Sequence, residues 1–113
     1  MAQLTWSQAL TANQLGFNPL SGWQYEYLPA GTRVQLILRS TTTGTRVTIY
    51  SGSQTIQERS IIQGGGTAGV TPSPLNTTVI EFLAPAGDRL KLAIDEVAGG
   101  TPTTDGVVIL PDL

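Results

Sequence analysis

The chain has 113 residues and contains neither cysteine nor histidine, which excludes disulfide bonds, cysteine-ligated metals and the catalytic triads that depend on histidine. Only 12% of its residues are charged and the net charge is -2, so no basic face is available to bind nucleic acid. The length predicts one domain over residues 1–113, and the sequence shows neither a secretory signal nor an apolar stretch long enough for a membrane helix.

The N-terminal part of the chain has a weak pattern. Its apolar residues fit neither the helical nor the strand period, so residues 1–21 are expected to be irregular apart from a short strand at 4–6. Turn-forming residues then precede a strand on which three aromatic side chains share one side, namely Trp23, Tyr25 and Tyr27.

Alternation of apolar and polar residues is strong in the first half of the chain. Residues 32–39 and 45–50 both alternate, and the turn-forming residues between them predict a hairpin. The side chains expected to point inward are Val34, Leu36, Leu38, Val47 and Ile49. The next run, 54–62, is expected to be an edge strand, because charged residues interrupt its alternation.

The second half begins after a long connection. Residues 64–74 are rich in glycine and proline and predict no regular element. Strands are expected at 77–83 and 88–94, separated by a Pro-Ala-Gly turn. In the second of these strands the inward side chains are Leu90, Leu92 and Ile94.

The end of the chain is expected to be loose. Asp95, Glu96 and Val97 break the alternation, which suggests a bulge or the end of a strand. Residues 99–113 are predicted to form a loose C-terminal tail that contains one last strand at 106–110, buried on both faces.

An internal repeat links the two halves. Residues 26–36 recur as residues 81–92 with one extra residue, Ala84. Each copy runs from an aromatic strand through Pro-Ala-Gly into an alternating strand, and the glycine is expected to take the positive φ of a type II turn that sets the register of a hairpin. Pro-Ala-Gly is also a common turn that can occur twice by chance.

These elements predict an all-β protein. About eight short strands in two related halves, joined by a long crossover, indicate a two-sheet antiparallel sandwich with jelly-roll or Greek-key topology. An immunoglobulin-like sandwich is the main rival, although its cysteine pair and central tryptophan pattern are absent.

The chemistry available to the chain is narrow. Catalysis would rest on carboxylates whose spacing favours no pair, so no enzyme activity, catalytic residue, metal or cofactor is expected. Asp95, Glu96 and Asp105 are oxygen ligands that calcium could use, but they are expected to be solvated ends of strands. The sequence Asn76-Thr77-Thr78 matches a glycosylation sequon, which is expected to be unused.

The aromatic residues Trp23, Tyr25 and Tyr27 have two interpretations. On one strand face they could form a platform on which sugar rings stack, which would make the protein a carbohydrate-binding module. Aromatic side chains that alternate along a strand are usually part of the core, and that interpretation is favoured.

With the repeat of 26–36 and 81–92, its Thr- and Gly-rich strands and its loose connections, the chain resembles the small jelly-roll cement, or decoration, proteins of tailed-phage capsids. The resemblance implies a virion protein, made in the host cytoplasm, that forms a homotrimer and stabilises the lattice of the major capsid protein. It implies binding through loops and arms, for which 2–19 and 101–113 are the candidates. A spike, tail or fibre domain is the alternative within the virion.

Overall fold

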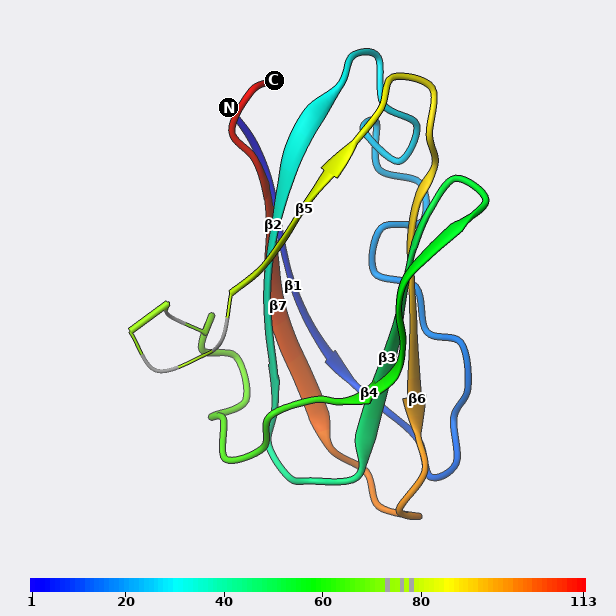
Figure 1. Ribbon diagram of the computed structural model, residues 1–113. Coiled ribbons are helices and arrows are strands. Elements are labelled where there is room, and N and C mark those ends of the chain that lie inside the picture. The colour runs from blue at the N-terminus through cyan, green and yellow to red at the C-terminus, as the bar shows by residue number, and fades with distance from the viewer. Residues whose placement is uncertain (73, 76, 78) are drawn as a thin grey trace.

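The computed structural model describes residues 1–72, 74–75, 77 and 79–113, and in these residues it contains seven strands and no helix. The strands form two antiparallel sheets that face each other (Figure 1). The larger sheet has the order β1-β7-β2-β5, with β1 at Ala2–Ala9, β7 at Thr103–Leu110, β2 at Thr32–Ser40 and β5 at Ile80–Ala84. The smaller has the order β4-β3-β6, with β4 at Gln54–Ile61, β3 at Thr45–Ser51 and β6 at Leu90–Glu96.

An irregular segment extends the smaller sheet beyond β6. Phe17 forms a bridge with Ile94, and Tyr27 forms one with Arg89. Residues 14–28 bond to residues 88–96 near both of their ends and form turns between them. If this interrupted segment is counted as an eighth strand, there are two four-stranded layers, and every connection except β3–β4 crosses from one layer to the other. This order is that of a jelly roll, so the all-β sandwich expected from the sequence is confirmed.

The core lies between the two sheets and is lined by the alternating side chains that the sequence predicts to point inward. All five inward residues predicted in β2 and β3 are buried, as are the three in β6. Leu110 from β7 and Leu20 from the irregular segment also belong to this cluster. Each fully buried side chain of this size contributes about 1.5–3 kcal/mol of hydrophobic stabilisation.

The hairpin predicted for 32–50 is wrong. β2 pairs with β7 and β5, whereas β3 pairs with β4 and β6, so the turn between them carries the chain from one sheet to the other. Apolar alternation determines which face of a strand is buried, but it does not determine which strand lies beside it. The expected edge strand is confirmed, because β4 pairs with β3 alone and is bulged.

Both ends of the chain are more regular than the sequence suggests. β1 extends over Ala2–Ala9 and pairs along its whole length with β7, which lies between β1 and β2. Residues 1–21 are therefore not irregular throughout, and 99–113 are not a loose tail. The first and last residues lie side by side because Ala2 pairs with Leu110 (Figure 1). Residues 2–9 and 103–110, which make up much of the two candidate arms, are therefore held in the sheet in this fold.

The two copies of the repeat do not form hairpins, and they pair with each other instead. The ladder between β2 and β5 runs from Thr32–Ala84 to Leu36–Ile80, and the bridge between Tyr27 and Arg89 keeps the same register beyond the turns. The two copies thus form one antiparallel ladder that runs from the larger sheet to the smaller sheet. Each Pro-Ala-Gly segment is the corner at which its strand passes from one sheet to the other. Gly87 has a φ of 87°, whereas Gly31 is not in the positive-φ region, so only the second corner matches the expected turn.

Candidate interaction surfaces

Glu26 and Arg89, one from each copy of the repeat, form the closest ion pair of the described chain. Arg89 Nη2 lies 2.6 Å from Glu26 Oε2, and its Nε donates to the same oxygen at 2.7 Å. The backbone N–H of Gly22 donates to Glu26 Oε1 at 3.2 Å. Arg89 and then Gly22 hold the pKa of Glu26 below its ordinary value. This carboxylate therefore fixes the corner of the fold.

Glu96 occupies the inward position at the end of β6, where the sequence suggests a break in alternation. Only 1% of the residue is exposed, so the expectation that it is solvated is wrong. Its Oε2 accepts from the N–H of Asn13 at 2.8 Å and of Gly99 at 3.0 Å, and Oε1 accepts from Ala98 at 2.8 Å. These amides, with Asn13 first, lower the pKa of Glu96. The carboxylate joins two loops to the sheet.

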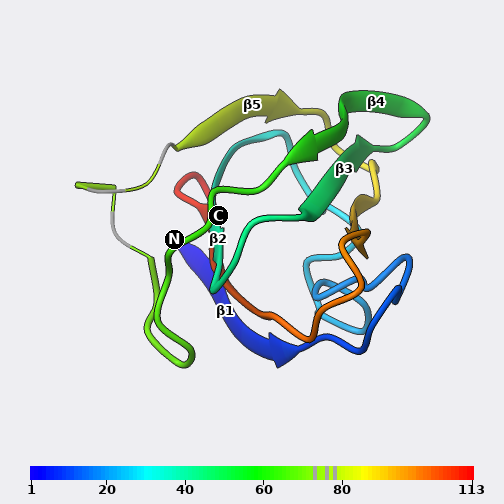
Figure 2. The ribbon, with the colours of Figure 1, turned by 90° about the horizontal axis from the view of Figure 1, so that it is seen from below.

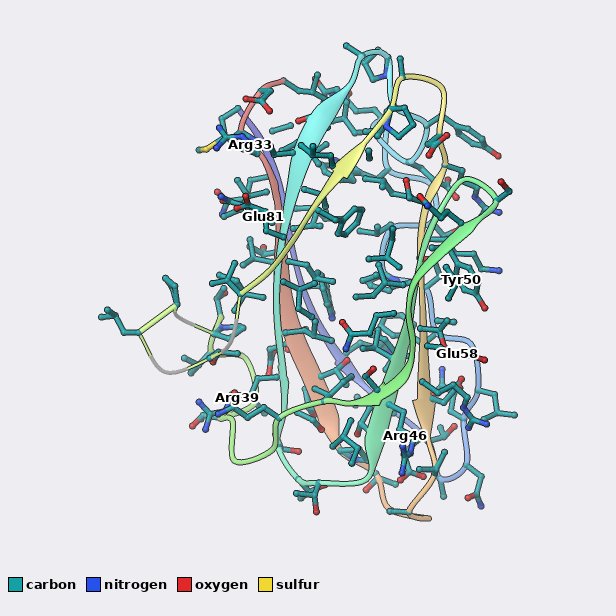
Figure 3. The ribbon with its side chains drawn as sticks, viewed as in Figure 1. Arg33, Arg39, Arg46, Tyr50, Glu58 and Glu81 are labelled. Atoms are coloured by element: carbon teal, nitrogen blue, oxygen red, sulfur yellow. The ribbon has the colours of Figure 1, made fainter. Side chains whose placement is uncertain are left out.

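Asp105 is likewise buried, with 3% of the residue exposed, and is not a solvated strand end. Its Oδ1 accepts from the N–H of Gly69 at 3.2 Å, while Arg39 Nε donates to the carbonyl of Gly64 at 3.1 Å. The two side chains attach the connection 64–72 to the outer face of the larger sheet. Figure 3 shows Arg39 pointing to that side of the sandwich.

The remaining acids of the described chain, apart from Glu58, also have partners. Gln35 Nε2 donates to Glu81, Ser51 donates to Asp88, Arg59 pairs with Asp95, and Arg33 binds Asp112. Within the described residues no group of three or more acids could hold a metal ion. The sequon begins at Asn76, which with Thr78 lies outside the residues described.

The structure separates the three aromatic residues proposed as a sugar platform. Trp23 and Tyr25 lie in consecutive turns, not in a strand, and both are half-buried against the core. Their rings meet edge to face, with centroids 5.5 Å apart and an interplanar angle of 78°. Tyr27 is 62% exposed and lies beside the guanidinium of Arg89. They do not share one flat surface.

A polar hollow that the sequence did not suggest lies on the outer face of the smaller sheet. Its volume is about 330 Å³, and its lining includes Tyr50, Glu58 and Arg59. Figure 3 shows Tyr50 and Glu58 pointing away from the interior. Lys91 Nζ lies 5.4 Å from the centre of the Tyr50 ring, and Arg59 Nε is 3.4 Å from Asp95. The bulge in β4 positions Arg59, and no sequence pattern marks that bulge.

An apolar opening lies between the edge strands β4 and β5. It has a volume of about 290 Å³ and reaches the core residues Leu38, Val47 and Ile62. Ile61 stands at its rim with 66% of its surface exposed. Figure 2 shows β4 and β5 on the side of the molecule opposite β1. Gln57, Gln63 and Thr77 also line the opening, so it offers a contacting macromolecule an apolar centre with polar groups around it.

The edges of the two sheets differ in how they are protected. β4 carries Glu58 and Arg59 and a bulge, while β5 has only five residues and carries Glu81. Charges, bulges and short length all hinder pairing with another chain. β1 has eight residues, an uninterrupted register with β7, and neither charge nor proline. It is the one unprotected edge strand among the seven described.

The described residues include no helix that could cross a membrane. Comparisons with models of protein families, with curated proteins and with solved structures found no match.

Proposed function

We propose that this protein is a non-enzymatic structural protein of a virion, a decoration protein that binds the outer surface of a capsid and stabilises the lattice of its major capsid protein. The observation that carries the proposal is the apolar opening between β4 and β5, with exposed Ile61 at its rim. A surface of this kind gains stability when another protein covers it.

The use of the carboxylates supports the same proposal. Seven of the eight acids have partners that hold a corner, a loop or a strand, as Glu26, Glu96 and Asp105 do. The surface that is left is rich in hydroxyl and amide groups, which lose less solvation free energy in a permanent interface than charged groups do. Many such contacts, repeated over a symmetric shell, reinforce one another.

A binding experiment with shells tests this function. Capsid shells of the phage whose genome encodes the chain, prepared without it, are mixed with the protein and sedimented. We expect the protein to sediment with the shells and to raise their melting temperature. Ile61→Asp should weaken binding, whereas Leu15→Asp, at an equally exposed position away from the opening, should not. Failure of the wild-type chain to sediment with the shells would refute the proposal.

Carbohydrate binding is a second candidate, and the hollow at Tyr50 favours it. An aromatic ring beside carboxylate, guanidinium and hydroxyl groups offers a sugar both a stacking surface and hydrogen bonds. A glycan array followed by titration of any positive sugar tests it. Tyr50→Ala should abolish that binding and Tyr27→Ala should leave it intact, because Tyr27 lies outside the hollow. No bound glycan on the array would remove this candidate.

A further inference from the structure

We propose that the free edge of β1 joins two copies of this chain, with β1 of one copy pairing antiparallel with β1 of the other. Most of the pairing groups are available: β1 bonds to β7 on one side only, and the only further bond to its backbone among the described residues is from Gln8 Nε2 to the Ala9 carbonyl. A long edge strand without charge, proline or bulge is ready to accept another strand. The edge strands β4 and β5 each carry at least one of these protections, and β6 is charged and is partly covered by residues 14–28.

The side chains of β1 are self-complementary when the two-fold axis passes beside Thr5. In that register Thr5 lies opposite Thr5 of the second copy, Leu4 opposite Trp6, and Gln3 opposite Ser7. Gln3, Thr5 and Ser7 are exposed, whereas Leu4 and Trp6 are half-buried on the core side. The pairing thus sets polar residues against polar residues on the outer face and Leu4 against Trp6 on the inner face, while Ala2 lies opposite Gln8 near the ends of the ladder.

The absence of charged residues from β1 favours a second copy as the partner of this edge. Self-pairing brings identical side chains together, so a strand that carries a net charge opposes its own pairing. β5 carries only the negative charge of Glu81, and two such strands would repel each other. β1 has no charged residue, so nothing opposes the approach of its own copy.

The pair closes at two copies and changes the larger sheet. A two-fold contact uses the same edge on both partners and leaves no free β1 to propagate a fibre. The two larger sheets become one sheet of eight strands, in the order β5-β2-β7-β1-β1-β7-β2-β5. Half-buried Leu4 and Trp6 lose further contact with water, which adds hydrophobic stabilisation. None of this depends on binding to a shell.

Two charge variants at the axis test the proposal with the purified protein alone. Thr5→Lys and Thr5→Glu each place two like charges opposite each other, and either variant should weaken the pair by about tenfold or more. Thr5 is exposed, so neither variant is expected to disturb the fold. An equal mixture of the two should restore pairing as a heterodimer, since opposite charges then meet. Thr55→Lys, on the edge of the other sheet, is the matched control and should pair as the wild type does.

Sedimentation equilibrium measures the result. The wild-type chain should weigh twice the 11.9 kDa of one copy, each charge variant should weigh close to one copy, and the mixture should again weigh two. A wild-type chain that stays monomeric up to about 1 mM, or that forms three copies, would overturn the proposal. So would a pair that survives both Thr5 substitutions. A pair without any shell binding would refute the proposed function and leave this inference intact.

Discussion

The ring of Trp6 in β1 lies over Gly106 of β7, in the space that a side chain at position 106 would occupy. A Cβ at Gly106 would overlap the Cζ2 and Cη2 atoms of Trp6, which is its direct cross-strand neighbour. The ring of Trp6 can pack against β7 in this way only because position 106 has no side chain.

Gly106→Ala should accordingly destabilise the protein by about 1–3 kcal/mol, because overpacking forces the indole ring or the strand to move. Urea unfolding measures the change. Gly100→Ala is the control: a Cβ there would meet nothing closer than 4.0 Å, and stability should change by less than about 0.5 kcal/mol. Equal effects at the two positions would contradict the packing described for Trp6.

The two glycines of the repeated corners should respond differently to alanine. Gly87 has a φ of 87°, so Gly87→Ala should cost about 1–2 kcal/mol of folding free energy. Gly31 is outside the positive-φ region, and an added Cβ would lie 3.7 Å from the Ala84 carbonyl oxygen, an ordinary contact. Gly31→Ala should leave stability unchanged or raise it by up to about 1 kcal/mol. Thermal unfolding of the two variants provides the comparison.

Glu96 should make stability depend on acid pH. Its pKa is lowered in the folded state from an ordinary value of 4.5, so its stabilising effect is complete above that value and is lost as the pH falls through the folded pKa. Glu96→Gln should reduce stability at pH 7 and flatten the decline in stability below pH about 5. Urea unfolding from pH 7 to 3 tests this. Glu58→Gln, exposed on β4, should reproduce the wild-type curve.

Asp105 should control the order of the connection over the larger sheet. Asp105→Ala removes the acceptor of the Gly69 amide, and residues 64–72 should then exchange their amide hydrogens about ten times faster or more. Hydrogen exchange with mass spectrometry reads this segment directly. Asp112→Ala, which affects the pair with Arg33, should leave exchange at 64–72 unaltered.

Alanine substitutions of Trp23 and Tyr27 should differ in their effect on stability, because one side chain packs against the core and the other is exposed. Trp23 packs partly against the core, so Trp23→Ala should cost about 1–3 kcal/mol, less than the about 3–5 kcal/mol of a fully buried tryptophan. Tyr27 is mostly exposed, and Tyr27→Ala should cost less than about 1 kcal/mol. Chemical unfolding distinguishes them, and the reverse order would contradict the packing of Trp23 against the core.

The inward faces of the strands were predictable because a strand with one buried face has an apolar residue at every second position. Val34, Leu36 and Leu38 share one parity, and the residues of the other parity are polar apart from the buried Ile37, so one face of the strand is marked as buried. Ala2, Leu4 and Trp6 show the same alternation in β1. A strand longer than the expected residues 4–6 could therefore have been predicted from the sequence. Which strands pair was not predictable, since β2 and β3 would show the same alternation in one sheet or in two.

The buried acids could not be predicted for a different reason. A carboxylate at an inward position is tolerated only when donors surround it, and the first donor to Glu96 is Asn13, 83 residues away in the chain. The hollow at Tyr50 likewise depends on where a bulge places Arg59. Distant hydrogen bonds and bulges leave no local period.

The position of β7 between β1 and β2 also sets an order of events during synthesis. Both neighbours must wait for residues 103–110 to leave the ribosome before either can pair along its length with that strand. Until then the apolar faces of β1 and β2 remain without their central partner, a state in which nascent chains are prone to aggregate. Closure of the larger sheet is thus a late step, and its dependence on contacts between distant residues predicts slow folding.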